Sequence, residues 1–396
     1  MAAKTNFGLW RAALLCLALV LSRPARADAG APQSADAPAS GAKSDVAVPL
    51  GQSGAPGVKP TTLRWHDTVL YWDHALSTNS LGVGQDYQSR DPVYQMTIGL
   101  RPRYYLFEGE RSSVSVRGDF GVVTERTNSD TTTREGEWSA TDFELYGAFS
   151  YRFRETKADV TELVMRLPRL TLPTSKVSYA SGKLLGLGAR VGLREDAVLE
   201  GRDAAFFPNV ELVIKAEYGY LFTNSQVTTN GGLERIRLDP EGRSIVSDQL
   251  SGASLARHAA AFGVATLLHV HQRLLWTTAL EIRPAWKYPI NHDVQVCAVV
   301  LTGCTAATGI SDPQTRSAIT YFYTEFWVTL NDLLGVSLGY ANLTAQLGPD
   351  GRRRSVFYSP DATFYATLGI GLDQLYSSLS GGARQSARSA SASRSH

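Results

Sequence analysis

The sequence predicts an all-β chain that closes into a transmembrane, antiparallel, up-and-down β-barrel of about 12 strands, within a range of about 10 to 12. Three observations predict it: apolar and polar residues alternate along most of the chain, short and long connections alternate between these segments, and an export signal precedes them. Successive side chains of a strand point to opposite faces, so alternation gives each strand one apolar and one polar face.

The two ends of the chain have compositions that differ from its centre. Lys4 and Arg11 precede an apolar run over 12–21, and a small-x-small sequence follows at 25–27. This is the pattern of a secretory signal peptide. Segments rich in Ala, Gly, Pro and Ser cannot bury enough apolar surface to offset their ordering entropy. The expected organisation is a signal peptide over 1–27, a disordered periplasmic linker over 28–60, the barrel over 61–376 and a disordered Ser/Ala/Arg-rich tail over 377–396.

The clearest alternation lies between Leu275 and Tyr288. Its even positions are nearly all apolar or aromatic, whereas its odd positions include Glu281 and Arg283. Trp276 and Trp286 share one face and would lie roughly 25 Å apart along a membrane normal in a tilted strand. That distance is the height of the apolar band of a membrane barrel, with an aromatic girdle at each rim. The predicted girdle comprises Trp276, Trp286, Tyr288, Tyr104, Tyr151, Tyr218 and Tyr220.

The same pattern predicts the other strands. Clear alternation extends over 94–104, 113–122, 142–153, 185–194, 210–222, 261–271, 275–288, 321–330, 334–341 and 363–373. The segment 160–168 is weaker, because Pro168 is expected to end it. The segment 63–74 is also weak, because Asp67 and Asp73 share a face with Val69 and Tyr71.

The connections support this assignment independently. Those near 109, 157, 273 and 331 are short, and those over 75–92, 124–137, 168–183, 223–254, 289–316 and 346–360 are long; 195–207 is of middling length. In membrane barrels the short turns face the periplasm and the long loops face outward. With 63–74 counted as a strand, the count is even and both termini lie in the periplasm.

On these features the chain resembles a Gram-negative outer-membrane β-barrel protein over about 61–376. The resemblance is one of architecture, without a particular family. It implies a location in the cell outer membrane, contact with its lipid, and insertion by the barrel assembly machinery. The last strand, with Phe364 and Leu368, resembles the insertion signal of that machinery but is followed by a tail. A soluble β-sandwich is the structural alternative, although its strands are usually shorter.

The polar rows would then line the lumen, and they carry both signs of charge in similar numbers. The predicted path of a solute comprises Arg101, Arg103, Arg117, Asp119, Asp142, Glu144, Arg190, Arg194, Lys215, Glu217, Glu281, Arg283, Tyr321, Tyr323 and Glu325. A barrel of about twelve strands is intermediate in size between a small barrel filled by its side chains and a large barrel with an open channel. The charges either pair and plug the lumen, or stand apart along a narrow wet channel. Inward glycines would favour an open path or allow backbone curvature.

The favoured function is a narrow, porin-like channel for passive passage of small polar or charged solutes. The contrasting hypothesis is a closed barrel that acts through its surface loops as an adhesin, receptor or scaffold; an outer-membrane enzyme is a remote alternative. No histidine has the serine two residues later that a lipid hydrolase of this kind uses, and His66 with Thr68 is a poor substitute. We therefore expect that the protein is not an enzyme. We also expect no metal site, no cofactor and no nucleic-acid partner. Cys297 and Cys304 are expected to form a loop disulfide, because the exported chain meets an oxidising compartment.

Overall fold

A computed structural model of the chain describes its central part. The described residues are 63–78, 93–127, 136–156, 159–199, 209–224, 235–238, 244–247, 255–271, 273–288, 295–298, 303–306, 316–345, 355–359 and 362–380. The predicted signal peptide, the linker and most of the predicted tail lie outside them.

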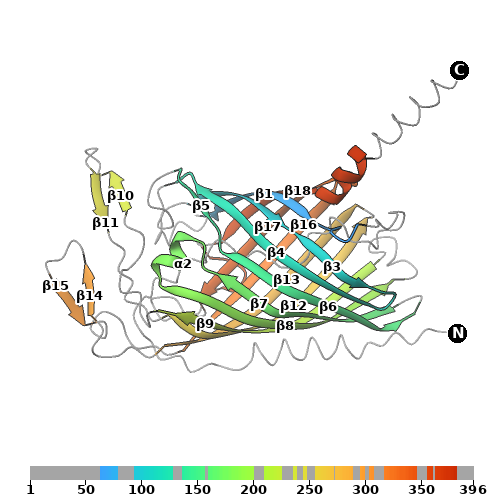
Figure 1. Cartoon of the computed structure of the whole chain (residues 1–396), viewed down its shortest axis with the longest axis horizontal. Helices are drawn as coiled ribbons and strands as arrows, with labels where there is room; N and C mark the ends of the chain where they lie inside the picture. The colour runs from blue at the N-terminus through green and yellow to red at the C-terminus, as the bar shows by residue number, and fades with distance from the viewer. Residues whose placement is uncertain are drawn as a thin grey trace, which may run out of the picture.

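The described strands close into an antiparallel barrel of twelve strands, which run obliquely around it (Figure 1). Strands β2 and β3 form one barrel strand, interrupted at Pro102, and the ring closes where β2 pairs with both β1 and β4. The barrel strands are β1 (Val69–Ser77), β2 (Tyr94–Arg101), β3 (Arg103–Glu108), β4 (Ser112–Glu125), β6 (Phe143–Glu155), β7 (Asp159–Leu172), β8 (Lys183–Val198), β9 (Asn209–Thr223), β12 (Ala256–His271), β13 (Leu274–Lys287), β16 (Arg316–Thr329), β17 (Leu334–Ala345) and β18 (Thr363–Gly371).

All ten clear strands and both weak ones are confirmed. The expectation that Pro168 ends a strand is wrong, because β7 continues to Leu172. A register shift between Arg166 and Arg169 in its pairing with β8 admits the proline, which has no backbone N–H to donate. Both sides of this bulge point an arginine inward, since the extra residue changes the parity of the strand.

The connections fall into two sets at the two ends of the barrel. Val69 at the start of β1 pairs with Gly371 at the end of β18, so the first and last strands enter and leave at one end, here called the terminal end. The predicted short connections all lie there, and the long ones lie at the opposite, loop end. At the loop end are β5 (Trp138–Ala140), helix α2 (Lys176–Ala180) and the hairpins of β10 (Arg235–Leu238) with β11 (Ser244–Ser247) and β14 (Gln295–Ala298) with β15 (Gly303–Ala306).

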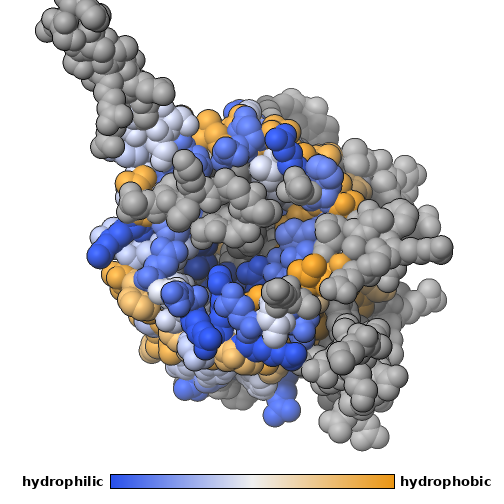
Figure 2. Space-filling view, turned by 90° about the vertical axis from the view of Figure 1, so that its right-hand side faces the viewer, coloured by the Kyte–Doolittle hydropathy of each residue, from blue (hydrophilic) through white to orange (hydrophobic). Residues whose placement is uncertain are grey.

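The two faces of the barrel differ as the alternation predicts. Large hydrophobic side chains are exposed on the outer face of most strands, among them Trp72, Phe153, Tyr218, Phe262, Phe326 and Leu338. A view of the terminal end shows hydrophilic residues around a central hollow and hydrophobic residues at the periphery (Figure 2). The outer surface is thus too apolar for water, and the polar rows turn inward.

Two short segments pack at the terminal end. Residues 63–68 precede β1 and lie along β3, where the Tyr105 N–H donates to the Arg64 carbonyl. A helix over 372–380 follows β18, and the rings of Trp65 and Tyr376 meet edge to face at 5.5 Å. The expected featureless tail therefore does not begin at 377, since residues 377–380 are helical. Within the described residues, no helix has the length and apolarity to cross a membrane.

Candidate functional site: the inner wall of the barrel

One part of the inner wall is built from aromatic rings that lie over glycines. A methyl group added at Gly99 would overlap the ring of Tyr71, and one at Gly335 would overlap Trp327. Gly339 lies in the same way beneath Tyr365. These pairs join neighbouring strands among β1, β2, β16, β17 and β18, whose inward face we call the aromatic wall. The expectation that inward glycines leave an open path is wrong at these positions, because rings occupy the space.

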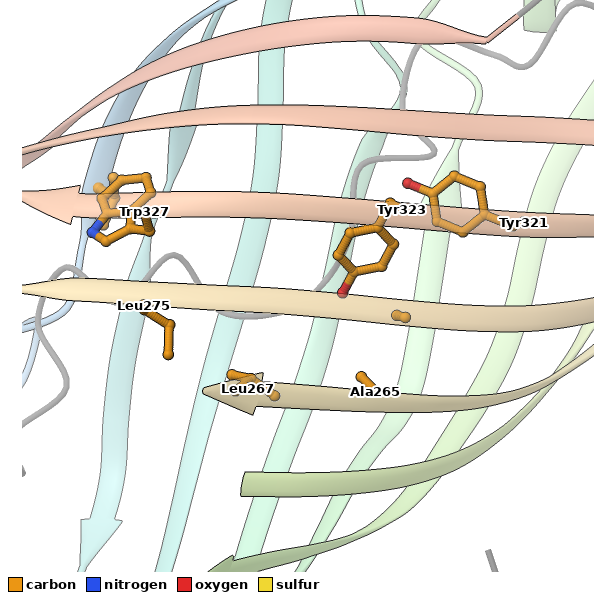
Figure 3. Close-up of a cluster of buried hydrophobic side chains, with 8 residues drawn as sticks. Ala265, Leu267, Leu275, Tyr321, Tyr323 and Trp327 are labelled. Carbon is orange, nitrogen blue, oxygen red and sulfur yellow. The ribbon is translucent and has the colours of Figure 1, made fainter. Parts of the chain in front are cut away.

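The aromatic wall continues into a buried cluster beside β12 and β13. Tyr321, Tyr323 and Trp327 on β16 form this cluster together with Leu275 and Ala265 (Figure 3). Tyr323 is 0 % exposed and Trp327 is 2 % exposed, so this part of the wall is closely packed. Tyr321 and Tyr323 thus fill volume within a wall.

The opposite part of the inner wall is built from ion pairs between strands. Arg169 on β7 donates to Glu144 on β6 at 2.7 and 3.2 Å, and also reaches across β8 to Glu217 on β9. Arg190 on β8 donates to the same Glu217, its Nε at 2.8 Å. One carboxylate therefore holds two guanidinium groups from two strands. We call the inward face of β6, β7, β8, β9, β12 and β13 the ionic wall.

A second group of charges lies further around the ionic wall. Lys215 on β9 pairs with Glu281 on β13, two strands away. Between them on β12 is Gly263, where a side chain would meet both partners. Glu281 also accepts from Arg283 at 2.8 and 3.0 Å, and the Arg283 guanidinium lies 4.4 Å from the centre of the Tyr321 ring. This glycine thus provides the room for an ion pair.

The third group lies near the terminal end of β8, β9 and β12. Glu211 is buried and pairs with Arg194 at 2.7 Å and with His269 at 2.9 Å. Arg194 also lies 3.8 Å from Glu162. His269 is therefore engaged by a carboxylate, and in the described part of the chain no group of three or more His, Cys, Asp or Glu side chains could hold a metal ion.

A cluster at the terminal end ties residues 63–68 to β3. Arg103 and the hydroxyl of Tyr105 both donate to Asp67, at 2.5 and 2.7 Å. Asp67 adopts a left-handed backbone with φ of 61° and is buried. The His66 ring stacks on Tyr105 at 4.0 Å and contacts Glu108 at 3.1 Å.

His66 and Asp67 in this segment have shifted pKa values. Burial lowers the pKa of His66, but its hydrogen bonds and charge interactions with Asp67 and Glu108 outweigh it, and the net shift is upward. Burial raises the pKa of Asp67, yet the hydrogen bond with His66 and the charge of Arg103 hold it below its usual value. The two shifts favour the doubly charged pair.

The remaining predicted lumen residues fall into separate contacts. Asp119 accepts from Arg101 at 2.9 Å and from Tyr71 at 3.0 Å, which joins β1, β2 and β4. Glu325 accepts from the Tyr365 hydroxyl at 3.3 Å. Asp142 is not brought to the other charges. It accepts from the Ser175 backbone N–H and the Ser178 hydroxyl, and so holds the start of α2.

Sequence reasoning missed three inward residues. Arg169 was missed because Pro168 was expected to end its strand. Asp73 and Tyr71 made β1 look inconsistent, because an aromatic and an acid share a face; that face points inward, and Asp73 accepts from Thr367. The signal that could have identified this face is that Leu70, Trp72 and His74 alternate with Tyr71 and Asp73 and point outward.

The predicted girdle residues lie near both rims on the outer face. Tyr104, Tyr151 and Trp276 lie toward the terminal end, and Tyr218, Tyr220, Trp286 and Tyr288 lie toward the loop end. Cys297 and Cys304 are register partners across the β14–β15 hairpin. Their side chains lie outside the described part, and the disulfide stays a prediction.

Comparisons with known proteins give no family. No protein-family model matches the chain, and no curated protein matches it. Solved structures similar to it include an outer membrane channel from Pseudomonas putida F1 (12% identity, TM-score 0.41, 79% of this chain and 99% of that chain). Others are the NanC porin (8%, 0.33, 77% and 98%) and LpxR from Salmonella typhimurium (8%, 0.34, 76% and 99%).

The class of the protein follows from its own geometry. A closed ring of twelve antiparallel strands has no free edge, its outer face is apolar, and its inner face is charged. The chain therefore has the architecture of an outer-membrane β-barrel protein.

Proposed function

We propose that this protein is an outer-membrane channel for passive passage of small polar or charged solutes through a charge-lined lumen. The short connections and both ends of the barrel then face the periplasm, and the loop end faces outward. The observation that carries the proposal is the direction of the ion pairs relative to the barrel wall. Each ion pair described above between residues of the barrel strands lies within one strand or joins strands that are neighbours or two apart, so it runs along the wall.

Partial exposure of these charges supports a wet lumen. The side chains of Arg101, Asp119, Arg194 and Arg283 are between 24% and 29% exposed although they point inward. A plug of packed ion pairs would exclude water from them. Hydrated charges along a narrow path attract ions and polar solutes while the protein pays little desolvation cost.

Single-channel conductance of the purified mature protein in a planar bilayer tests the proposal. We expect discrete current steps, and we expect Arg101→Ala to change the step size because Arg101 faces the lumen. Arg111→Ala is the matched control, since Arg111 is exposed in the turn between β3 and β4. Silence from folded, inserted protein would overturn the channel and favour a closed barrel.

The closed-barrel alternative has one observation in its favour. The long connections at the loop end carry the hairpins β10–β11 and β14–β15, which form sheets of their own outside the barrel sheet. Such loops could bind a partner without any conduction. We propose no enzymatic activity, because the Thr68 hydroxyl donates to the Trp65 carbonyl and not to His66.

A further inference from the structure

The inner wall contains arginines placed directly opposite one another. Arg103 on β3 is the register partner of Arg117 on β4, and Arg166 on β7 is the register partner of Arg190 on β8. Like charges directly opposite in a sheet destabilise it. A fold that keeps two such pairs in one region of its lumen accepts a cost in stability.

One arginine of each opposed pair has a carboxylate partner described above. Arg103 pairs with Asp67, and Arg190 pairs with Glu217. Arg117 is different: the hydrogen bond described for its side chain goes to the neutral hydroxyl of Ser115 at 3.2 Å. The charges that act on it include those of Arg103 and Arg166, which are of the same sign.

Tyr146 on β6 is a neighbour of both Arg117 and Arg166. It is the register partner of Arg117 on β6, and the Arg166 guanidinium lies 4.9 Å from the centre of its ring. The Arg166 guanidinium thus lies over the ring of the residue that pairs with Arg117. We call Arg117, Tyr146 and Arg166 the arginine site.

We propose that the arginine site binds a small oxyanion, a carboxylate or phosphate, on its way through the lumen. A guanidinium presents planar paired N–H donors that fit the two oxygens of such a group, and a second guanidinium beside it adds charge. An anion here would relieve the repulsion between opposed arginines. The inference rests on the proposed channel and adds the class of solute that it favours.

Reversal potentials in a potassium chloride gradient test the selectivity. We expect the wild-type channel to prefer chloride over potassium, and Arg117→Gln and Arg166→Gln each to reduce that preference. Malonate and inorganic phosphate, added separately, should reduce the chloride current. Block by at least one should weaken about fivefold or more in each variant, as expected for the loss of one unit charge at contact in water. Arg111→Gln removes the same charge from an exposed turn and should change neither quantity.

Thermal unfolding in detergent provides a readout that a purely structural arginine would not give. Arg117→Gln should unfold at the same or a higher temperature than wild type without added anion, because it removes a repulsion. Malonate or phosphate should stabilise the wild type and have a smaller effect on the variant. A marked loss of stability in Arg117→Gln without anion would assign Arg117 a structural role and overturn the inference.

The outcomes separate the two proposals. A conducting channel that prefers cations, or whose anion preference and block survive both substitutions, overturns the arginine site and leaves the channel intact. Absence of conductance from folded protein overturns the channel, and the anion-dependent unfolding of wild type against Arg117→Gln then supports or refutes the site on its own. Block by one oxyanion alone identifies the chemistry that the site prefers.

Discussion

The aromatic wall and the ionic wall solve the same problem with different chemistry. Both occupy the inner face of a barrel of intermediate size. The aromatic wall places rings such as those of Tyr71 and Trp327 over glycines, and its side chains are almost fully buried. The ionic wall links strands through Arg169, Glu217 and Lys215, whose side chains keep partial contact with solvent. The difference teaches that packing of rings secures one side of the barrel, whereas ion pairs between strands secure the other.

The largest expected effect comes from breaking the aromatic wall. Trp327→Ala should destabilise the barrel by about 3 to 5 kcal/mol, the usual cost of removing a buried large aromatic side chain. Phe326→Ala, the adjacent residue on the outer face, is the matched control and should cost much less, since Phe326 is 47% exposed. Thermal unfolding in detergent, followed by heat-modifiable gel migration, measures both. Equal losses would show that Trp327 does not secure the wall.

A smaller effect should follow from breaking the ionic wall. Glu217→Gln removes the carboxylate that Arg169 and Arg190 share and should cost about 1 to 3 kcal/mol at low salt. At about 1 M salt the cost should shrink, because the Debye length falls to about 3 Å. Glu110→Gln, in an exposed turn, is the control.

Salt also sharpens the comparison between the walls. The loss caused by Trp327→Ala should not shrink with salt, since it arises from lost packing and not from lost charge. A salt-independent loss in Glu217→Gln would remove the distinction between the two walls.

The smallest effect is expected outside both walls, at His66 and Asp67 in the terminal end. The raised pKa of His66 gives a stabilisation that is complete below about pH 6.5, its unfolded value, and is lost as the pH rises through the folded pKa. The lowered pKa of Asp67 gives a stabilisation that is present above its unfolded value of about 4 and is lost as the pH falls through its folded pKa.

Hydrogen exchange of the backbone amides of 63–68 at pH 6 and pH 8 measures this effect. Exchange should be faster at pH 8 after correction for the intrinsic rate, and His66→Phe should abolish the difference while keeping a ring against Tyr105. His271→Gln, an exposed histidine in the same end of the barrel, should leave it unchanged. If exchange in His66→Phe depends on pH as it does in the wild type, the pH dependence arises from another group.

Most of the barrel could be predicted from local pattern. Alternation identifies strands such as β13 because the side-chain period of a strand is two, whatever its neighbours are. The weak strands show the limit. Pro168 looks like an end when the chain is read alone, but a bulge against β8 carries β7 past it to Leu172. Asp73 looks misplaced until the ring closes and turns its face inward.

The candidate site could be predicted only as a set of inward residues. Composition and parity place Arg117, Lys215 and Glu217 on the polar face, and the structure puts them there. They do not say that Lys215 reaches Glu281 over Gly263, or that Arg117 faces Arg103. These contacts join residues on different strands, and their partners depend on the register of each pairing.

By itself the sequence determined the strands, their two faces, the even strand count and the alternation of connection lengths, because each of these follows from local periodicity and from the order of segments along the chain. Only the tertiary structure decided which charges pair, which glycines lie beneath rings or ion pairs, and where arginines stand opposed. The physical reason is that closing the barrel fixes the register between strands, and register alone brings residues from distant parts of the chain within contact distance.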